Sequence, residues 1–327
     1  MIAKVGVIGG GAWGTALAQV AAEGGETLLW AREEEVVSGL NRDHENRLFL
    51  PGVALDPGIR ATGDLADLAD CEALLVVTPA QHMRSVLGAL PPGSAPLILC
   101  AKGMEEASTK LMHDVAREER PDAPVAVLSG PTFAHEVAAR RPAAVTLAVE
   151  DRAVGERLRA RLARPWFRPY LSDDVVGAEI GGAVKNILAI ACGVVEGRRL
   201  GLNARAALIS RGFAEMTRFG LARGARAETL AGLSGLGDLV LTCSSENSRN
   251  FSLGKGLGEG RDAAALLADR RTVAEGAHTA PVLARAAHAA GVDMPIVSAV
   301  CALLAGEASV EEVVERLLAR PLRSEGV

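Results

Sequence analysis

Three glycines near the N-terminus constrain the fold of this chain more than any other feature. Gly9, Gly11 and Gly14 lie in KVGVIGGGAWGTALA, directly after a short β-branched run and directly before a helix-like segment. Glycines at this spacing permit a tight turn, close approach of the backbone to a pyrophosphate, and close packing of helix on strand. The helix N-terminus then faces the anion. The pattern predicts a dinucleotide site, and a glycine-rich turn without a ligand is the alternative.

The first half of the chain alternates between strand-like and helix-like segments, which indicates a parallel sheet with helices on its faces. Helix-like stretches such as Thr15–Glu23 and Thr109–Glu119 separate several of the strand-like runs. We expect a Rossmann-type, doubly wound sheet whose strands include Val5–Ile8, Thr27–Trp30, Ala73–Val77, Leu97–Cys100, Val125–Leu128 and Ala144–Val149.

From about Asp174 the chain becomes rich in Ala and Leu at helical spacing, and no β-rich run follows. The sequence therefore predicts an α/β chain with two domains: a dinucleotide-binding domain over residues 1–176 and an all-helical substrate domain over 177–327. Gly254–Gly260 is expected to be a loop. The predicted helices are Ala178–Glu196, Ala204–Ala222, Asp262–Leu267, Ala280–Ala290 and Ile296–Leu304.

Composition excludes several classes of protein. The net charge of −5 and the lack of a basic tract argue against a nucleic-acid partner. No uncharged apolar stretch is long enough for a membrane span, and the N-terminus does not resemble a signal peptide. Five scattered cysteines lack the spacing of a metal site, so we expect reduced thiols, no metal, and a cytoplasmic location.

Arg32 bears on the choice of cofactor. An Asp or Glu usually holds the adenine ribose at the end of the second strand, but LLWAREEE places Arg32 there and Glu33 after it. Arginine suits a 2′-phosphate, whereas Glu33 suits the ribose of NAD. We expect NADP to be preferred and NAD to be tolerated. The alternative is that Arg32 and Glu33–Glu35 form a solvated loop and the start of a helix.

Lys185 stands in the small and apolar segment GAEIGGAVKNILAIACG. Helical side chains lean over the residues three and four before them, which are Gly182 and Gly181 here, so the amine would project over a gap for a ligand. The chain has five lysines against thirty arginines, which suggests that Lys185 does something arginine cannot do, namely lose its proton. A structural lysine paired with a carboxylate is the alternative.

Three polar, glycine-containing stretches are candidates for binding an anion. Two follow strands of the predicted sheet, where open α/β sheets bind ligands: CAKG with Lys102, and SGPTFAHE with Gly130 and Thr132. We expect His135 in the second stretch to be structural.

The third stretch is GLSGLGDLVLTCSSENSRN, which contains Asp238 and ends in Ser248, Arg249 and Asn250. If Ser248 caps a helix, backbone amides, a guanidinium and a side-chain amide converge on one anion.

Seven segments together resemble the bacterial NAD(P)-dependent sn-glycerol-3-phosphate dehydrogenases: IGGGAWGTALA, AKG, SGPTFAHEVA, GGAVKNILAIACG, GLGDLVLTC, NSRNFSLG and TVAEGAHTA. They occur in the family's order over nearly the whole chain. The resemblance implies interconversion of sn-glycerol 3-phosphate and dihydroxyacetone phosphate, which supplies the backbone of phospholipids. We also expect a homodimer.

The resemblance also implies a role for each matching residue. Lys185 is expected to be the catalytic proton acceptor. Expected substrate contacts are Lys102, Gly130, Thr132, Lys185, Asp238, Ser248, Arg249 and Asn250. Expected cofactor contacts are Gly9, Gly11, Ala12, Trp13, Gly14, Arg32, Lys102, Ala134, Arg249, Val273 and Glu275. Many members carry Ser where this chain has Ala12, so only the backbone N–H remains there to meet the pyrophosphate.

Two other interpretations stay open. A β-hydroxyacid or 6-phosphogluconate-type dehydrogenase also joins a dinucleotide fold to a helical domain with a lysine, but the NSRN segment favours a phosphorylated glycerol. A non-catalytic dinucleotide sensor would keep the glycines, yet it would have no need for Lys102, Lys185 and Arg249 together.

Overall fold

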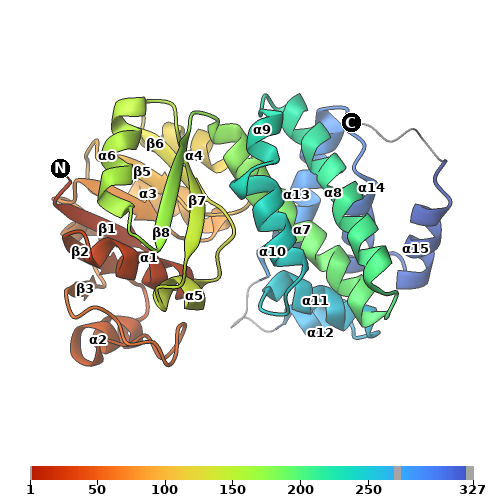
Figure 1. The fold of residues 1–327 in the computed structure, drawn as a ribbon, viewed down its shortest axis with the longest axis horizontal. Helices are drawn as coiled ribbons and strands as arrows, with labels where there is room; N and C mark the ends of the chain where they lie inside the picture. Colours follow the sequence, from red (N-terminus) through yellow and green to blue (C-terminus); the bar gives the residue numbers. More distant parts are fainter. Residues whose placement is uncertain (1, 269–273, 322–327) are drawn as a thin grey trace. The chain divides into compact units, whose positions relative to one another are not determined.

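One sheet organises the N-terminal part of the chain (Figure 1). The computed structural model describes residues 2–268 and 274–321, and eight strands in these ranges pair in the order β3-β2-β1-β4-β5-β6-β7-β8. All neighbours are parallel except β6 and β7, which are antiparallel. The strands are β1 (Lys4–Ile8), β2 (Glu26–Trp30), β3 (Ile59–Thr62), β4 (Ala73–Val76), β5 (Leu97–Leu99), β6 (Val125–Ser129), β7 (Ala143–Val149) and β8 (Phe167–Ser172).

The α/β class and the six predicted strands are confirmed, and the sheet is mostly parallel, with the antiparallel pair of β6 and β7 as the exception. The two strands that the sequence did not predict, β3 and β8, lie at the edges of the sheet. Only one face of β8 is well buried, by Phe167 and Pro169, whereas Arg168 and Tyr170 are exposed. Edge strands lack the continuous apolar character that reveals a central strand.

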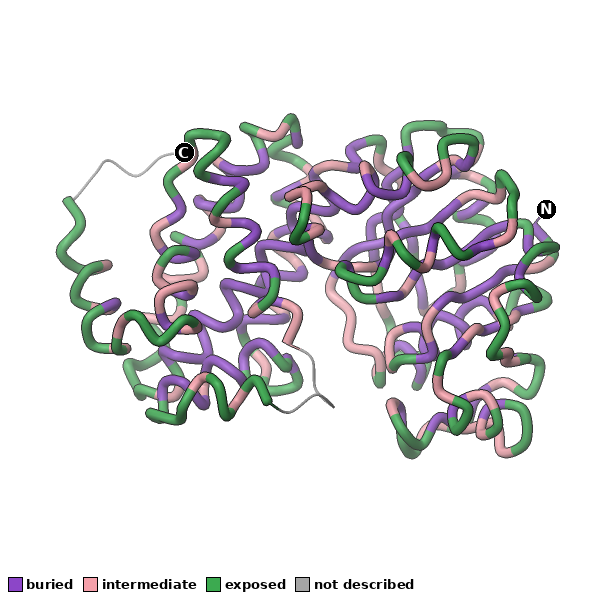
Figure 2. Tube along the Cα trace, turned by 180° about the vertical axis from the view of Figure 1, so that it is seen from behind, coloured by how far each residue is buried: buried purple, intermediate pink, exposed green. Residues whose placement is uncertain are grey.

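Helices cover both faces of this sheet (Figure 1). Side chains of α1 (Ala12–Ala22), α5 (Ala134–Ala138) and α6 (Arg152–Leu162) share one buried cluster with the sheet. Side chains of α3 (Ala80–Ala89) and α4 (Met112–Glu119) share a second cluster with it. The strands between the clusters are mostly buried, shown in purple in Figure 2. Two further elements, α2 (Glu34–Asp43) and η1 (Leu65–Leu68), complete this part.

The rest of the described chain contains helices and no strand. These are α7 (Val175–Gly197), α8 (Leu202–Ala222), α9 (Ala227–Leu230), the π-helix η2 (Leu233–Gly237), α10 (Asp238–Cys243), α11 (Arg249–Gly258), α12 (Ala263–Leu267), α13 (Glu275–Ala289), α14 (Pro295–Leu304) and α15 (Val310–Leu318). The five predicted helices are all present, and α15 and the short elements between α8 and α11 were not predicted.

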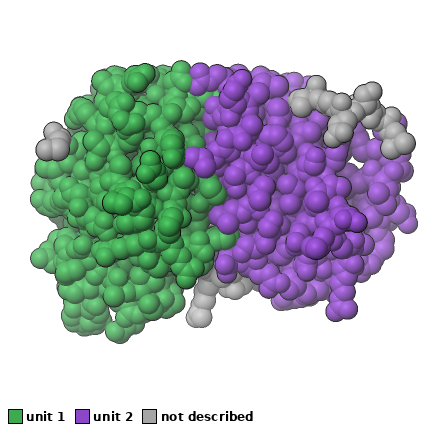
Figure 3. Space-filling model, in the orientation of Figure 1, with its two compact units in different colours: residues 1–101, 111–178 green, residues 102–110, 179–327 purple. Residues whose placement is uncertain are grey.

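The chain divides into two units, coloured separately in Figure 3. The first unit takes residues 1–101 and 111–178, and the second takes residues 102–110 and 179–327. The sequence placed a domain boundary between residues 176 and 177. It did not indicate that residues 102–110, which follow β5, belong with the helical unit.

Gly254–Gly260 was expected to be a loop, and this is wrong because α11 continues through Gly258. A Cβ on Gly254 would lie 1.9 Å from the Ile190 carbonyl oxygen, and a Cβ on Gly193 would lie 2.0 Å from the Phe251 carbonyl oxygen. These glycines let the backbones of α7 and α11 approach closely. The glycine pattern therefore reports a helix crossing.

Helix α7 is the core helix of this unit. Among the described residues it alone is long and apolar enough to cross a membrane by length and composition, but 94% of its most apolar 18-residue stretch is buried inside the protein. Such burial is typical of a central helix in a globular protein, and it makes the apolar length of α7 weak support for a membrane span.

Candidate functional site

Lys185 lies near the middle of α7, and its side chain is held by two groups of α10. Its Nζ donates to Asp238 Oδ1 at 2.9 Å and to Thr242 Oγ1 at 2.8 Å. Lys185 is 7% exposed and Asp238 is fully buried. The hydroxyl of Thr242 donates in turn to the Asp238 carbonyl oxygen at 2.7 Å. The Lys185 ammonium is therefore paired with the Asp238 carboxylate, and the two hydrogen bonds fix its orientation.

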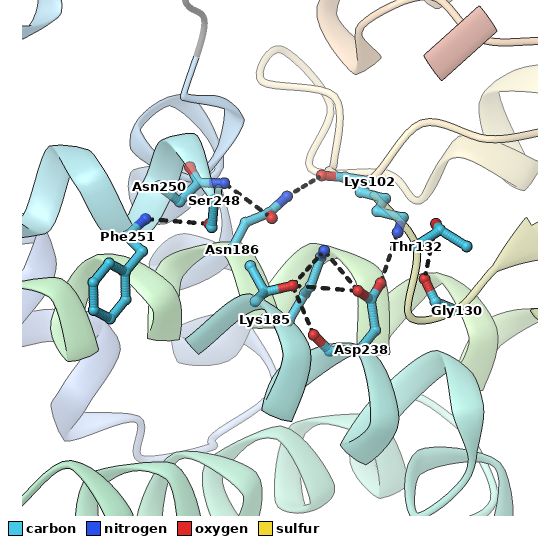
Figure 4. A network of polar contacts seen from close by, with 10 residues as sticks. Lys102, Gly130, Thr132, Lys185, Asn186, Asp238, Ser248, Asn250 and Phe251 are labelled. Atoms are coloured by element: carbon cyan, nitrogen blue, oxygen red, sulfur yellow. Dashed lines mark hydrogen bonds and ion pairs between the residues drawn. The ribbon is translucent and has the colours of Figure 1, made fainter. Parts of the chain in front are cut away.

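Lys102 meets the other oxygen of the same carboxylate. Its Nζ donates to Asp238 Oδ2 at 2.6 Å, and Figure 4 shows both lysines pointing toward Asp238. The backbone is fixed as well, since Asn186 Nδ2 donates to the Lys102 carbonyl oxygen at 3.3 Å. Asp238 thus bridges the two lysines.

A glycine of α7 makes this arrangement possible. A Cβ on Gly181 would lie 2.3 Å from the Ser234 carbonyl oxygen in η2, the π-helix that leads directly into α10. Gly181 was expected to leave a gap for a ligand, and this is wrong because the protein's own backbone fills that space. π-helical turns often occur at functional sites. This one leads into α10, where Asp238 lies within hydrogen-bond distance of Lys185.

Burial and charge set the protonation of the pair. Burial lowers the pKa of Lys185 to about 8, with the charge of Lys102 acting in the same direction and Asp238 opposing it. Burial alone would raise the pKa of Asp238, but the charges and hydrogen bonds of the two lysines outweigh it, and the pKa is lowered. The site therefore holds an ionised carboxylate beside an amine that titrates close to physiological pH.

Ser248 caps α11 as the sequence predicted, because its Oγ accepts from the Phe251 N–H at 3.2 Å. Arg249 is exposed at the first position of this helix, whereas Asn250 is buried. Asn250 Nδ2 donates to Asn186 Oδ1 at 3.0 Å, and its Oδ1 accepts from the Gly276 N–H at 2.9 Å. The Asn250 amide is therefore hydrogen-bonded within the helical unit, and its contact with the substrate stays a prediction.

Glu275 begins α13, beside Gly276. Burial raises the pKa of its carboxyl group, and the positive charges of Arg249, Lys102 and Lys185 partly oppose that shift. The electrostatic influence of all three cations places Glu275 in the same neighbourhood of the helical unit. Val273, another expected cofactor contact, lies outside the described residues.

Of the three fingerprint glycines in the first unit, only Gly11 has open space where a side chain would lie. A Cβ on Gly14 would lie 1.8 Å from the Gly9 carbonyl oxygen, and Gly9 has a φ of +123°. A Cβ on Gly11, by contrast, would meet no described atom within 4 Å. Gly11 is also the N-cap of α1 and offers no side chain to its first amides. Those N–H groups are available for an anion.

Other groups of this unit fit a dinucleotide. The buried Trp13 Nε1, in the first turn of α1, has no hydrogen-bond partner among the described residues. Ala12 is the first residue of α1 and presents its backbone N–H there. The side chain of Arg32 is 81% exposed and reaches Glu33 Oε1 at 3.1 Å. These residues fit a pyrophosphate and a ribose at the carboxyl end of β1 and β2.

The remaining predicted residues of the first unit follow β6. Gly130 has a φ of +154°, and a Cβ there would lie 2.9 Å from the Cα of Val145. Thr132 Oγ1 donates to the Gly130 carbonyl oxygen at 3.3 Å, and Ala134 begins α5. His135 stacks on Phe133 with ring centroids 5.9 Å apart. The described residues contain no group of three His, Cys, Asp or Glu side chains that could hold a metal ion.

Comparisons with known proteins agree with this architecture. The family description "NAD-dependent glycerol-3-phosphate dehydrogenase N-terminus" matches residues 4–155, and the corresponding C-terminus matches residues 174–315. The chain belongs to the NAD-dependent glycerol-3-phosphate dehydrogenase family. It is accordingly an NAD(P)-dependent oxidoreductase with a Rossmann-type domain.

Relatives in this family cover almost the whole chain. A glycerol-3-phosphate dehydrogenase (NAD(P)+) of Erythrobacter litoralis is 65% identical over 326 residues, which is 99% of this chain and 98% of that protein. One of Sphingopyxis alaskensis is 64% identical over 322 residues, covering 98% of each. The crystal structure of glycerol-3-phosphate dehydrogenase from Coxiella burnetii is 36% identical, has a TM-score of 0.92, and covers 98% of this chain and 99% of that one.

Two residues of this glycerol-3-phosphate dehydrogenase site were not predicted. Thr242 lies four residues after Asp238, on the same face of α10, so the i, i+4 rule gave a signal for it. Asn186 stands beside Lys185 in the sequence, but nothing local indicated that its amide would reach Lys102 and Asn250. Both residues orient the groups that were predicted.

Proposed function

We propose that this glycerol-3-phosphate dehydrogenase interconverts sn-glycerol 3-phosphate and dihydroxyacetone phosphate, with Lys185 as its general acid and base. One observation carries the proposal: a buried lysine, with a pKa lowered to about 8, is aimed by Asp238 and Thr242. A group that titrates near the working pH is well suited to proton transfer.

In the reductive direction the Lys185 ammonium donates a proton to the C2 oxygen of the ketone while negative charge develops there. In the oxidative direction the neutral amine takes the hydroxyl proton. The nicotinamide, when bound, supplies or accepts the hydride. Asp238 stays ionised throughout and keeps both lysines oriented, and Lys102 adds a second positive charge for the substrate oxygens.

The substrate phosphate is proposed to be bound by Arg249 and the amides at the N-terminus of α11. Ser248 supports this site by capping the helix, and Asn250 supports it by tying α11 to Asn186 and Gly276. Gly130 and Thr132 stay proposed substrate contacts. A phosphate distant from the reacting carbon can contribute binding energy to orientation at that carbon.

A spectrophotometric assay of NADPH oxidation tests the proposal with the unmodified enzyme. We expect rapid turnover of dihydroxyacetone phosphate and very slow turnover of dihydroxyacetone, which lacks the phosphate. Preferential oxidation of 3-hydroxy acids would support the β-hydroxyacid dehydrogenase interpretation instead. Cofactor binding without turnover of any of these compounds would support the dinucleotide sensor.

NADP is proposed as the preferred cofactor, with NAD tolerated, because Arg32 is exposed beside the end of β2. Arg32→Ala should weaken NADPH binding about tenfold or more and leave NADH binding nearly unchanged, since a charge-assisted hydrogen bond to the 2′-phosphate is worth about 1.5–3 kcal/mol. Dissociation constants from fluorescence titration measure both. Equal weakening of the two cofactors would show that Arg32 does not contact that phosphate.

The cellular setting is also a proposal. The described cysteines are all free thiols, which suits the cytoplasm, where the product would enter phospholipid synthesis. A homodimer stays a prediction; exposed Leu200, which precedes α8, and exposed Leu202, which begins it, offer apolar surface for it. Sedimentation of the purified protein measures the oligomeric state.

A further inference from the structure

Asn46 lies outside every predicted motif, yet its side chain contacts the glycine loop. It belongs to the chain between α2 and β3, and it is 1% exposed. Its Nδ2 donates to the Gly10 carbonyl oxygen at 2.8 Å and to Thr15 Oγ1 at 2.8 Å. Its Oδ1 accepts from the Phe49 N–H at 3.1 Å.

These bonds use the full donor capacity of the Asn46 side-chain amide. Both protons of the Nδ2 group have an acceptor, and the Oδ1 atom ties the side chain to its own segment. The Asn46 carbonyl oxygen also accepts from the Leu50 N–H at 2.9 Å, which closes this segment into a turn. Asn46 is thus a fixed donor placed against the glycine loop.

The bond to Gly10 determines where the next amide points. In a trans peptide the C=O and the following N–H point in opposite directions. The Gly10 carbonyl faces Asn46 inside the protein, so the Gly11 N–H faces the other side. Gly11 itself is accessible to a ligand, because a Cβ built on it would meet no described atom within 4 Å.

The loop needs such a restraint because Gly9, Gly10 and Gly11 are consecutive glycines. Glycine reaches positive and negative φ with similar ease, so a peptide between two glycines reorients at low energetic cost. Thr15 Oγ1 also donates to the Gly10 carbonyl oxygen, but at 3.4 Å, which is a weaker bond than the one from Asn46.

We propose that Asn46 is a positioning residue for the dinucleotide: it fixes the Gly10–Gly11 peptide so that the Gly11 N–H faces the pyrophosphate. This inference rests on the proposed function, because it concerns the cofactor of the same reaction. It assigns a role to a residue about 35 positions beyond the glycine fingerprint, in a segment that touches no reacting atom.

Asn46→Asp is the sharpest test. The variant is nearly isosteric and keeps an acceptor for Phe49, but it places an oxygen against the Gly10 carbonyl oxygen. We expect the dissociation constant for NADPH, measured by fluorescence titration without substrate, to rise more than about thirtyfold. Asn46→Ala only removes the donor and should raise it about tenfold.

Asn41→Ala is the matched control. Asn41 also binds main-chain atoms in the same unit. Its Nδ2 donates to the Ala61 carbonyl oxygen at 2.9 Å, and its Oδ1 accepts from the Ala61 N–H at 2.9 Å. No hydrogen bond of its side chain reaches the glycine loop. We expect its NADPH affinity to be unchanged. Thermal unfolding identifies any variant that fails to fold. If Asn46→Asp fails to fold, the NADPH affinity of Asn46→Ala tests the inference by itself.

The order of the two variants separates positioning from packing. If Asn46 only filled space, the isosteric Asp would be milder than Ala, and that order would overturn the inference. So would an unchanged NADPH affinity in both folded variants. The KM for dihydroxyacetone phosphate should stay within about twofold of the unmodified value. Failure of the unmodified enzyme to turn over that substrate would instead contradict the proposed function.

Discussion

The cluster of buried Asp238 and Lys185 with partly buried Lys102 combines two requirements in three side chains. An isolated buried ammonium is costly, so a carboxylate must pair with it. Full pairing would hold the pKa of Lys185 near its ordinary value and make it a poor proton donor at neutral pH. Burial is the main cause of the lowered pKa of Lys185, and the positive charge of Lys102 on the same carboxylate acts in the same direction, while Asp238 opposes both.

Thr242→Val should affect the pH dependence of turnover. The threonine oxygen accepts from the Lys185 ammonium at 2.8 Å, so its loss destabilises the charged form and lowers the pKa further below about 8. Ketone reduction requires the ammonium, and its rate therefore falls as pH rises through that pKa. In the variant this fall should begin at lower pH, and kcat should decrease about tenfold.

Thr217→Val provides the control for that experiment. Thr217 is also buried and bonds the Phe213 carbonyl oxygen within its own helix at 2.9 Å, but it does not contact Lys185. Its pH profile should match that of the unmodified enzyme. An unchanged profile in Thr242→Val as well would show that the hydroxyl does not control the protonation of Lys185.

Individual residues were predictable where their type was unusual. Lys185 stood out because the chain rarely uses lysine and because glycines precede it. The carboxylate that pairs with it, Asp238, lies 53 residues away, so only the family resemblance suggested that both belong to one site. Asn46 carried no signal, because its role depends on a contact with the backbone of Gly10.

Helix α7 is the element on which the site depends. Two of its glycines lie where the backbones of neighbouring helices approach it closely. Because Gly181 has no side chain, η2 can pack close to α7 and place α10 beside it, and Gly193 lets α11 pack close in the same way. The sequence predicted α7 well, because its period and length are those of a buried helix. It did not predict that α11 includes Gly254–Gly258, since glycine lowers helix propensity and the compensating contact comes from another helix.

Gly254→Ala tests this packing. Its Cβ would lie 1.9 Å from the Ile190 carbonyl oxygen, and backbone atoms of α7 have little room to move. We expect the free energy of unfolding to fall by about 2–4 kcal/mol, because overpacking outweighs the gain of about 1 kcal/mol in helix propensity. Urea unfolding followed by circular dichroism measures the difference.

Gly256→Ala, in the same helix, is the comparison. The atoms nearest to a Cβ there belong to the side chain of Leu266, the closest at 2.9 Å, and a side chain can move more easily than backbone, so the loss should be smaller or absent. Equal destabilisation by the two substitutions would contradict a specific close approach of α7 and α11 at Gly254.

At the scale of the whole molecule, the chain divides its task between two units. The sheet unit provides the glycine loop, and the helical unit provides the lysine cluster. The alternation of strands and helices predicted a sheet domain, and the Ala- and Leu-rich segments after about Asp174 predicted a helical one. Local patterns could not show that Lys102 belongs with the helical unit, because its partner Asp238 lies 136 residues further along the chain.

The stability of the molecule should depend on Glu215, a buried residue remote from the proposed chemistry. It lies on α8, is 2% exposed, and accepts from the Ile296 N–H of α14 at 2.8 Å. Burial raises the pKa of its carboxyl group to about 7, and the bonds from Ile296 and Val297 only partly oppose this. Between pH 4.5 and 7 the folded protein therefore holds a proton that the unfolded chain has released.

Glu215→Gln should remove that pH dependence. As pH rises from about 5 to 8, the unmodified protein should lose stability relative to the variant by an amount of the order of 3 kcal/mol. Glutamine keeps an acceptor for Ile296, so the fold is retained. Urea unfolding of both proteins across this range measures the difference, and a difference that is constant with pH would show that Glu215 does not titrate there.

Replacement of Lys185 by arginine tests the central claim most directly. Arginine preserves the positive charge but does not release its proton near neutral pH. The measurement is the rate of NADPH oxidation with saturating dihydroxyacetone phosphate, with the NADPH dissociation constant determined on the same sample. We expect the rate to fall at least about hundredfold while NADPH binding changes less than about twofold. A variant that keeps more than about a third of the original rate would contradict proton transfer by Lys185.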